Sequence, residues 1–132
     1  MPTLSIEYGF CFTDPPYNVR YGESKNPKHK IREIENDWQT AEEWESFVKK
    51  FGTIIKDRCT GDCYIWGASG PDGMKMRLWL IEMGLHWSAT IIWKKQQLIL
   101  SPAKYQRMYE PCLYGWFAEK SSFTGDRTQV EV

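Results

Sequence analysis

The sequence contains no apolar run that approaches the ~20 residues needed to span a membrane. It also lacks net charge, because 17 Lys plus Arg balance 17 Asp plus Glu. The first absence argues against a membrane protein, and the second against a whole-molecule field that would attract a polyanion. No signal-peptide segment precedes the first cysteine, so we expect a soluble, cytoplasmic protein. With 132 residues, 42% of them hydrophobic, a single compact domain is expected.

Cysteine is scarce as well, with only Cys11, Cys59, Cys63 and Cys112. Four thiols in a chain large enough to build a core do not indicate a disulfide scaffold, so we expect them to be reduced. Cys59 and Cys63 have the spacing of half a zinc site. No second pair or nearby His completes four ligands, so structural cysteines and no metal are predicted.

The first half of the chain predicts a strand, a loop and a helix. Residues 4–12 are apolar and aromatic with little alternation, which is typical of a strand buried on both faces, and they end at Asp14. Residues 18–37 are polar and rich in turn formers, which predicts a long irregular loop. Thr40 followed by Glu43 has the capping-box pattern, and the apolar spacing behind it predicts a helix over residues 41–58.

The second half predicts another strand and helix, then two strands. Residues 62–68 form the strand, and a Ser-Gly-Pro-Asp-Gly break begins a helix that ends at Met83, before Gly84. The last two strands are predicted at residues 86–94 and 110–117, and residues 118–132 form a polar tail that we expect to be loosely held. This order predicts an α/β fold with a parallel first pair of strands, a C-terminal antiparallel pair and helices on the faces.

Sheets of this kind bind ligands at the carboxyl ends of their strands, where Asp14-Pro15-Pro16-Tyr17 lies. The exocyclic amine of a nucleobase is a poor nucleophile because its lone pair is conjugated with the ring, so its modification needs acceptors for its N–H groups. Asp14 supplies a carboxylate, and Pro15 supplies a carbonyl whose direction Pro16 restrains. Tyr17 adds a flat face for a base taken out of the duplex. We therefore predict that these four residues are catalytic.

Residues 13–19, Thr-Asp-Pro-Pro-Tyr-Asn-Val, resemble motif IV of the amino-directed DNA methyltransferases. Four further blocks resemble later stretches of the phage and prophage branch of that family, so the resemblance covers essentially the whole chain: residues 64–69, 91–95, 109–116 and 125–127.

The resemblance implies a partial S-adenosylmethionine-dependent methyltransferase sheet, which is Rossmann-like. It also implies direct methyl transfer from that cofactor to adenine N6 or cytosine N4 of a flipped base in double-stranded DNA, without a covalent enzyme intermediate. A bacterial or phage-encoded protein, in a restriction-modification or prophage setting, is implied as well.

The sequence departs from this family at the cofactor site. Relatives of this branch carry a Gly-rich turn of the Asp-Pro-Phe-x-Gly-x-Gly type after the catalytic half, and no Gly-x-Gly turn follows an apolar strand here. We therefore expect half of a methyltransferase sheet, with either a truncated chain or a partner that supplies the rest. The first strand would then have an open edge, which a homodimer or a complementing cofactor-binding chain would cover.

Several residues near the motif have two interpretations. Arg20, Lys28 and Lys30 could grip phosphates beside the base, although acidic neighbours make a solvated loop an equal alternative. Asn18 is expected to contact the substrate. Trp66 could line the base pocket or pack in the core, and Lys94 could face the same groove or end a solvated strand.

Two other functions stay open at this point. The chain could be an inactive remnant that binds DNA or a partner, or a methyltransferase that acts on RNA or protein. Pockets for glutamine amides usually carry Asn where this chain has Asp14. That difference argues against a protein substrate.

Overall fold

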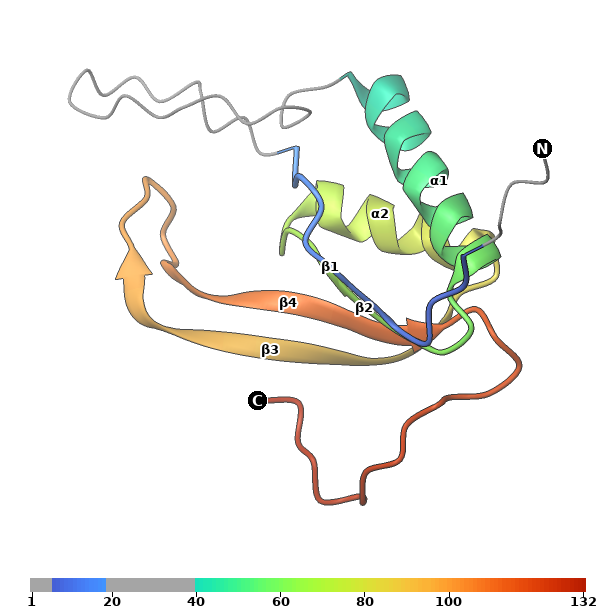
Figure 1. Ribbon diagram of the computed structural model, residues 1–132. Coiled ribbons are helices and arrows are strands. Elements are labelled where there is room, and N and C mark those ends of the chain that lie inside the picture. The colour runs from blue at the N-terminus through green and yellow to red at the C-terminus, as the bar shows by residue number, and fades with distance from the viewer. Residues whose placement is uncertain (1–5, 19–39) are drawn as a thin grey trace.

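The computed structural model describes residues 6–18 and 40–132. Its elements are β1 (Cys11–Thr13), α1 (Ala41–Arg58), β2 (Asp62–Trp66), α2 (Pro71–Glu82), β3 (His86–Ile99) and β4 (Arg107–Trp116). They form one four-stranded sheet in the order β1-β2-β4-β3, in which β1 and β2 are parallel and the other pairs antiparallel (Figure 1). The predicted α/β fold, with a parallel first pair and an antiparallel last pair, is confirmed.

Helix α1 begins at the predicted capping box. The Thr40 backbone N–H donates to Glu43 Oε2 over 2.9 Å, and the Glu43 N–H donates back to Thr40 Oγ1 over 3.2 Å. The helix buries Trp44, Val48 and Ile55, whose spacing puts them on one face. Its predicted bounds, residues 41–58, are confirmed.

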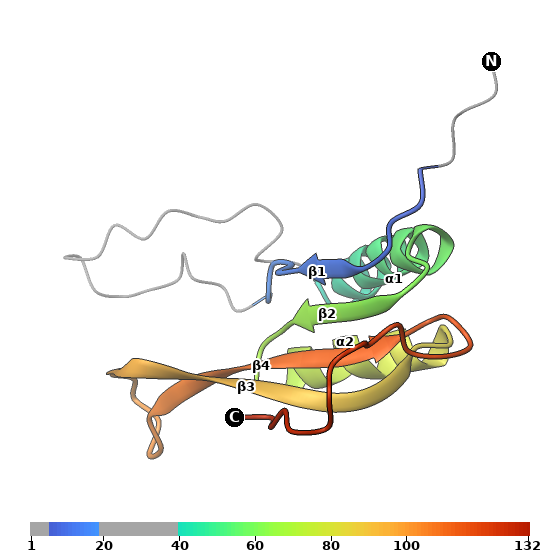
Figure 2. The same cartoon turned by 60° about the horizontal axis from the view of Figure 1, so that its bottom comes forward.

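Both helices lie on the same face of the sheet (Figures 1 and 2). The core between the helices and the sheet contains Val48 of α1, Leu80 of α2, Ile65 of β2 and Leu113 of β4, each fully buried. Gly84 adopts a φ of 105°, which a side chain would disfavour, and this turn ends α2 as predicted. No helix in residues 6–18 and 40–132 is long and apolar enough to cross a bilayer.

The other face of the sheet carries aromatic side chains. Phe12 and Trp93 both lie edge-on to Trp66, and Tyr114 contacts Tyr64 with ring centroids 5.0 Å apart. The C-terminal segment runs along this side in both ribbon views (Figures 1 and 2).

The prediction of a long first strand buried on both faces is wrong for its described part. Regular pairing covers only Cys11–Thr13, preceded by an isolated bridge between Tyr8 and Cys59. The side chains of Ile6, Phe10 and Phe12 are 59–66% exposed. The reason is physical: β1 is an edge strand, no described element pairs with its outer edge, and these side chains therefore stay largely exposed.

The last two strands are longer than predicted, and the tail is held more firmly. β3 continues to Ile99 and β4 begins at Arg107, so the hairpin extends past the ends of β1 and β2 (Figure 1). The buried Asp62 carboxylate accepts hydrogen bonds from the Ser121 hydroxyl and the Ser122 N–H. Ile92 N–H donates to the Glu131 carbonyl over 2.6 Å, so the tail is anchored at both ends.

Candidate functional site

The site lies where β1 and β2 end side by side. The two strands are parallel, and Thr13 is in register with Ile65, so Asp14–Tyr17 follows one strand where residues 67–69 follow the other. The carboxyl ends of adjacent parallel strands form a common edge, which is where ligands bind in open α/β sheets. The predicted motif therefore occupies the position that the fold favours for chemistry.

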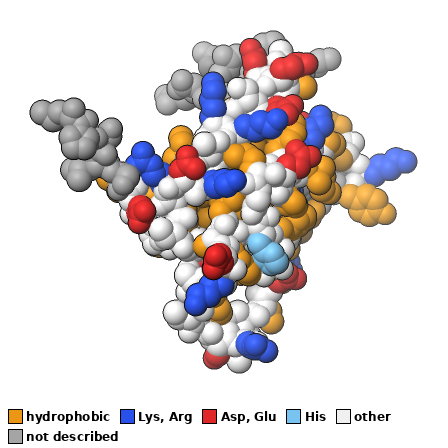
Figure 3. Space-filling model, turned by 90° about the vertical axis from the view of Figure 1, so that its right-hand side faces the viewer, with side chains coloured by type: hydrophobic (Ala, Val, Ile, Leu, Met, Phe, Trp, Pro, Cys, Tyr) orange, Lys and Arg blue, Asp and Glu red, His pale blue; other side chains and the backbone are white. Residues whose placement is uncertain are grey.

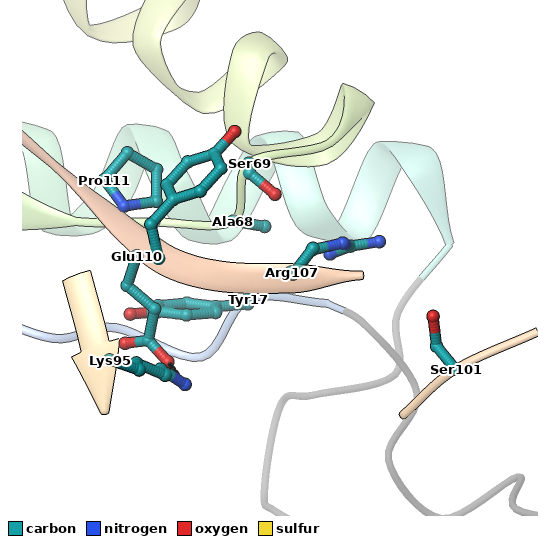
Figure 4. A pocket seen from close by; sticks show the side chains of 10 residues that line it. Tyr17, Ala68, Ser69, Lys95, Ser101, Arg107, Glu110 and Pro111 are labelled. Carbon is teal, nitrogen blue, oxygen red and sulfur yellow. Dashed lines mark ion pairs between the residues drawn. The ribbon is translucent and has the colours of Figure 1, made fainter. Parts of the chain in front are cut away.

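A cavity of about 190 Å³ opens beside Tyr17 (Figure 4). Its walls come from the turn after β1, the loop after β2, the strand β3, the loop between β3 and β4, and the start of β4. The lining residues are Tyr17, Gly67, Ala68, Ser69, Lys95, Ser101, Arg107, Tyr109, Glu110 and Pro111. Aromatic, small and charged side chains thus share one space, as in a pocket that holds a flat polar ligand.

The motif residues differ sharply in exposure. Asp14 is exposed, Pro15 is buried, and Tyr17 is half-buried against the cavity. Asn18 is 8% exposed and has a φ of 58°, a left-handed conformation that Asn tolerates better than most residues. The turn therefore fixes Pro15 in the protein while it leaves the Asp14 carboxylate accessible.

Two groups of opposite charge close one wall of the cavity. Lys95 of β3 forms an ion pair with Glu110 of β4 (Figure 4). The Lys95 amine also lies 5.6 Å from the ring centroid of Trp93. Arg107 is exposed at the start of β4 and lines the same cavity. The wall therefore presents one neutralised pair and one accessible guanidinium.

Arg77 of α2 supports the floor of the cavity from below. It is 5% exposed, and its Nη1 donates to the Ala68 carbonyl over 3.3 Å. Burial lowers the pKa of Arg77, and Tyr109 and Tyr17 lie close enough to oppose that effect. Among the described residues, its Nε and Nη2 have no hydrogen-bond partner. Because Arg77 belongs to α2 and donates to the loop after β2, a change in α2 should also move this loop.

None of the four cysteines is among the lining residues of the cavity. Burial raises the pKa of Cys112 to about 11, and burial also raises the pKa values of Cys11 and Cys63. A thiol that stays protonated is a weak nucleophile and a weak metal ligand. Within the described parts of the chain, no three His, Cys, Asp or Glu side chains come together to hold a metal ion.

The structure brings only some of the predicted site residues together. Asp14–Asn18 lies in one turn, with Tyr17 in the cavity wall. Trp66 packs between Phe12 and Trp93 on the aromatic face of the sheet. Lys94 is exposed on β3, and its neighbour Lys95 is the one that lines the cavity. The three predicted phosphate contacts lie outside the described residues: Arg20, Lys28 and Lys30.

Ser69, Ser101 and Arg107 line the cavity and were not predicted as site residues from the sequence. Ser69 follows a predicted strand directly, so the rule that ligands bind at strand ends could have identified it. Ser101 lies in the loop between β3 and β4, and Arg107 lies where β4 begins earlier than predicted. No local pattern marked them, because hairpin pairing alone brings them to the cavity.

The comparison with protein families agrees with the fold. No curated protein matches the chain. The family model described as DNA methylase matches residues 9–132, which is nearly the whole sequence and includes both the Asp14–Tyr17 turn and every residue of the cavity wall. The α/β sheet is a partial methyltransferase sheet of Rossmann-like type, and the chain belongs to the N6/N4 DNA methylase family.

Proposed function

We propose that this chain forms the target-base half of a DNA methyltransferase that modifies the exocyclic amine of adenine or cytosine. One observation carries the proposal: the exposed Asp14 carboxylate follows β1 directly, in the same short turn as Tyr17, which lines the cavity. The motif IV resemblance and the family of the chain support the same assignment. The bacterial or phage setting, and a role in restriction-modification or in a prophage, are proposed on the resemblance alone.

Asp14 and Pro15 would prepare the amine nitrogen for methylation. The Asp14 carboxylate and the Pro15 carbonyl accept hydrogen bonds from the two N–H groups, which turns the nitrogen lone pair out of conjugation with the ring. Both acceptors also stabilise the positive charge that grows on nitrogen as it gains a methyl group. Since Pro15 is buried, its carbonyl is already held in place before a base arrives.

Tyr17 would hold the base that enters the cavity. Its ring forms part of the wall, and an aromatic face stacks on any nucleobase with a contribution of about 1–3 kcal/mol. A base must leave the duplex before it can stack there, and such extrusion is common to enzymes that modify bases. Arg107 and Ser69 lie in the same wall, where they can donate to ring nitrogens or to the sugar-phosphate backbone.

The residues of this cavity do not fit S-adenosylmethionine, the methyl donor that DNA methylases generally use. A sulfonium cation needs acceptors, whereas the wall presents the Arg107 guanidinium, and Glu110, the one carboxylate among the described lining residues, already pairs with Lys95. The sequence also lacks the Gly-x-Gly turn that would approach the cofactor. We assign the cofactor site to sequence outside residues 1–132, in the same protein or in a partner chain.

The outer edge of β1 is where such cofactor-binding strands would join the sheet. Phe10 and Phe12 are 66% and 64% exposed beside this edge, and no described strand pairs with it. The opposite edge is different, because Glu131 accepts hydrogen bonds from the Thr90 and Ile92 N–H groups of β3. An open apolar edge on one side only favours extension of the sheet there, by a complementing chain or by a second copy of this one.

Recognition of the amine can be tested by comparing two DNA duplexes. One holds a central mispaired adenine, and the other holds purine, which lacks the exocyclic amine, at the same position. A mispaired base costs less to extrude, so the test does not require the recognition sequence. We expect the full chain to bind the adenine duplex about tenfold more tightly, the value of one good hydrogen bond to a charged acceptor. Cytosine against 2-pyrimidinone tests the other target.

Asp14→Ala should abolish this discrimination, whereas Asp57→Ala, on the exposed side of α1, should preserve it. Equal affinity of the unmodified chain for both members of each pair would refute amine recognition. That result would favour a remnant that binds DNA or a partner without selecting a base.

A further inference from the structure

The hairpin of β3 and β4 concentrates positive charge in a chain whose net charge is zero. Residues 94–107 include Lys94, Lys95, Lys104 and Arg107 and no Asp or Glu. This part of the hairpin extends beyond the ends of β1 and β2, on the side where those strands carry the site (Figures 1 and 2). A local cluster of cations is the feature that a neutral protein needs in order to bind a polyanion.

The opposite end of the molecule has no such separation of charge. On the face shown in Figure 3, Lys and Arg side chains alternate with Asp and Glu side chains, and apolar groups lie between them. The electric fields of neighbouring charges of opposite sign largely cancel, and salt screens what remains beyond a Debye length of about 8 Å at physiological ionic strength. Of these two ends of the described structure, only the hairpin therefore carries Lys and Arg without interspersed Asp and Glu.

Hydrogen bonds fix the tip of the hairpin, residues 100–107, in one shape. The Gln106 side chain accepts from the Ser101 N–H over 2.7 Å and donates to the Ser101 and Ala103 carbonyls over 3.1 and 2.7 Å. This clamp leaves Tyr105 90% exposed and Leu100 84% exposed. A loop that is already held in one conformation loses little conformational entropy when a partner binds to its exposed aromatic ring.

The tip also forms part of the cavity wall. Ser101 and Arg107 line the same space as Tyr17 (Figure 4). A nucleotide whose base enters this cavity must place its own phosphates, and those of its neighbours, against the hairpin. The tip is thus in reach of the strand that carries the target base.

We propose that the tip of the β3–β4 hairpin is a DNA-docking element, in which Lys104 and Arg107 bind phosphates beside the extruded nucleotide and Tyr105 stacks on an exposed base. Lys95 takes no part, because Glu110 already holds it. The proposal rests on the function proposed above and extends it from the target base to the flanking DNA. Phosphate contacts supply affinity and position, while the stacked ring stabilises the opened duplex.

The salt dependence of DNA binding by the full chain tests this element. Each phosphate contact contributes about 0.9 to the slope of log affinity against log salt concentration, so Lys104→Gln with Arg107→Gln should reduce the slope by about 1.8. The matched control is Lys50→Gln with Lys120→Gln, two exposed lysines outside the hairpin. It should leave the slope unchanged. A fluorescently labelled duplex with a central mispaired adenine serves as the probe.

Tyr105→Ala should weaken binding of the same duplex about 5- to 150-fold, and Tyr105→Phe should not, since the ring face is retained. An unchanged slope in the double variant, or equal binding by Tyr105→Ala and the unmodified chain, would overturn the docking role. The preference for adenine over purine tests the proposed function separately. This preference should persist in the tip variants, although their overall affinity for DNA is reduced. If the unmodified chain shows no such preference, base recognition is refuted. The salt-dependence slope would still test the role of the tip.

Discussion

Gly73, in the first turn of α2, lies so close to the floor of the cavity that its replacement should disturb the site. A Cβ at this position would overlap the Ala68 carbonyl oxygen and lie 2.6 Å from the Ala68 carbonyl carbon. Both atoms belong to the backbone, so neither can turn aside. Ala68 is also the residue that Arg77 holds by its carbonyl, and it lines the cavity. The Gly73→Ala variant must therefore push α2 and this loop apart.

Two opposing effects determine how much Gly73→Ala changes the free energy of unfolding. Forcing a methyl group into a packed contact destabilises a protein by about 1–3 kcal/mol. Alanine in place of glycine in a helix returns at most about 1 kcal/mol. We expect Gly73→Ala to lower the free energy of unfolding by about 1–2 kcal/mol net. It should also weaken binding of the adenine duplex, because the cavity floor moves.

Gly70→Ala is the matched control. Gly70 precedes the same helix, has a φ of −92° and has nothing within 4 Å of the position of an added Cβ. Urea unfolding, followed by tryptophan fluorescence at constant m-value, gives the change for both variants. If Gly73→Ala proves as stable as Gly70→Ala and binds DNA equally well, the account of this contact is incorrect.

Three further changes test the fold around the site. Asp62→Ala leaves the hydroxyls of Tyr114 and Ser121 without their buried acceptor, so unfolding should become easier by about 2–4 kcal/mol and residues 118–132 should become accessible to proteases; an unchanged urea midpoint would contradict this role. Thr40→Ala removes the cap of α1 and should cost about 1 kcal/mol by the same assay, with no loss expected if the capping box contributes nothing. The raised pKa of Cys112, about 11 against 9.0 for an ordinary thiol, means that the native state keeps a proton which the unfolded state loses first. The contribution of Cys112 to the free energy of unfolding should therefore be fully present below pH 9 and be lost between pH 9 and 11. The Cys112→Ala variant should show a smaller decline over this range than the unmodified chain.

The parts of the fold that sequence predicted well are those with local causes. Helix α1 was predicted to the residue, because the Thr40–Glu43 box and the apolar spacing behind it lie within the helix itself. The position of Asp14 at a strand end was predictable for a similar reason, since the two prolines must end β1.

The parts that sequence missed depend on distant partners. Residues 6–12 have the composition of a buried strand, and whether they are buried depends on elements that pair with them from elsewhere. The extension of the hairpin through Gln96 and Gln97 has no apolar alternation to mark it. Its regular pairing with β4 is interrupted after Lys94 and resumes at Ile99, which lies opposite Arg107. Arg107 reaches the cavity only through that pairing.

Titration calorimetry of the full 132-residue chain with S-adenosylmethionine, with and without a DNA duplex, shows whether these residues hold the methyl donor. We expect that the duplex binds saturably and that the cofactor releases no saturable heat in either case, because this half holds the target base and not the methyl donor. Saturable binding of S-adenosylmethionine to the chain would contradict the account, since it would mean that these residues build a cofactor site without the Gly-rich turn.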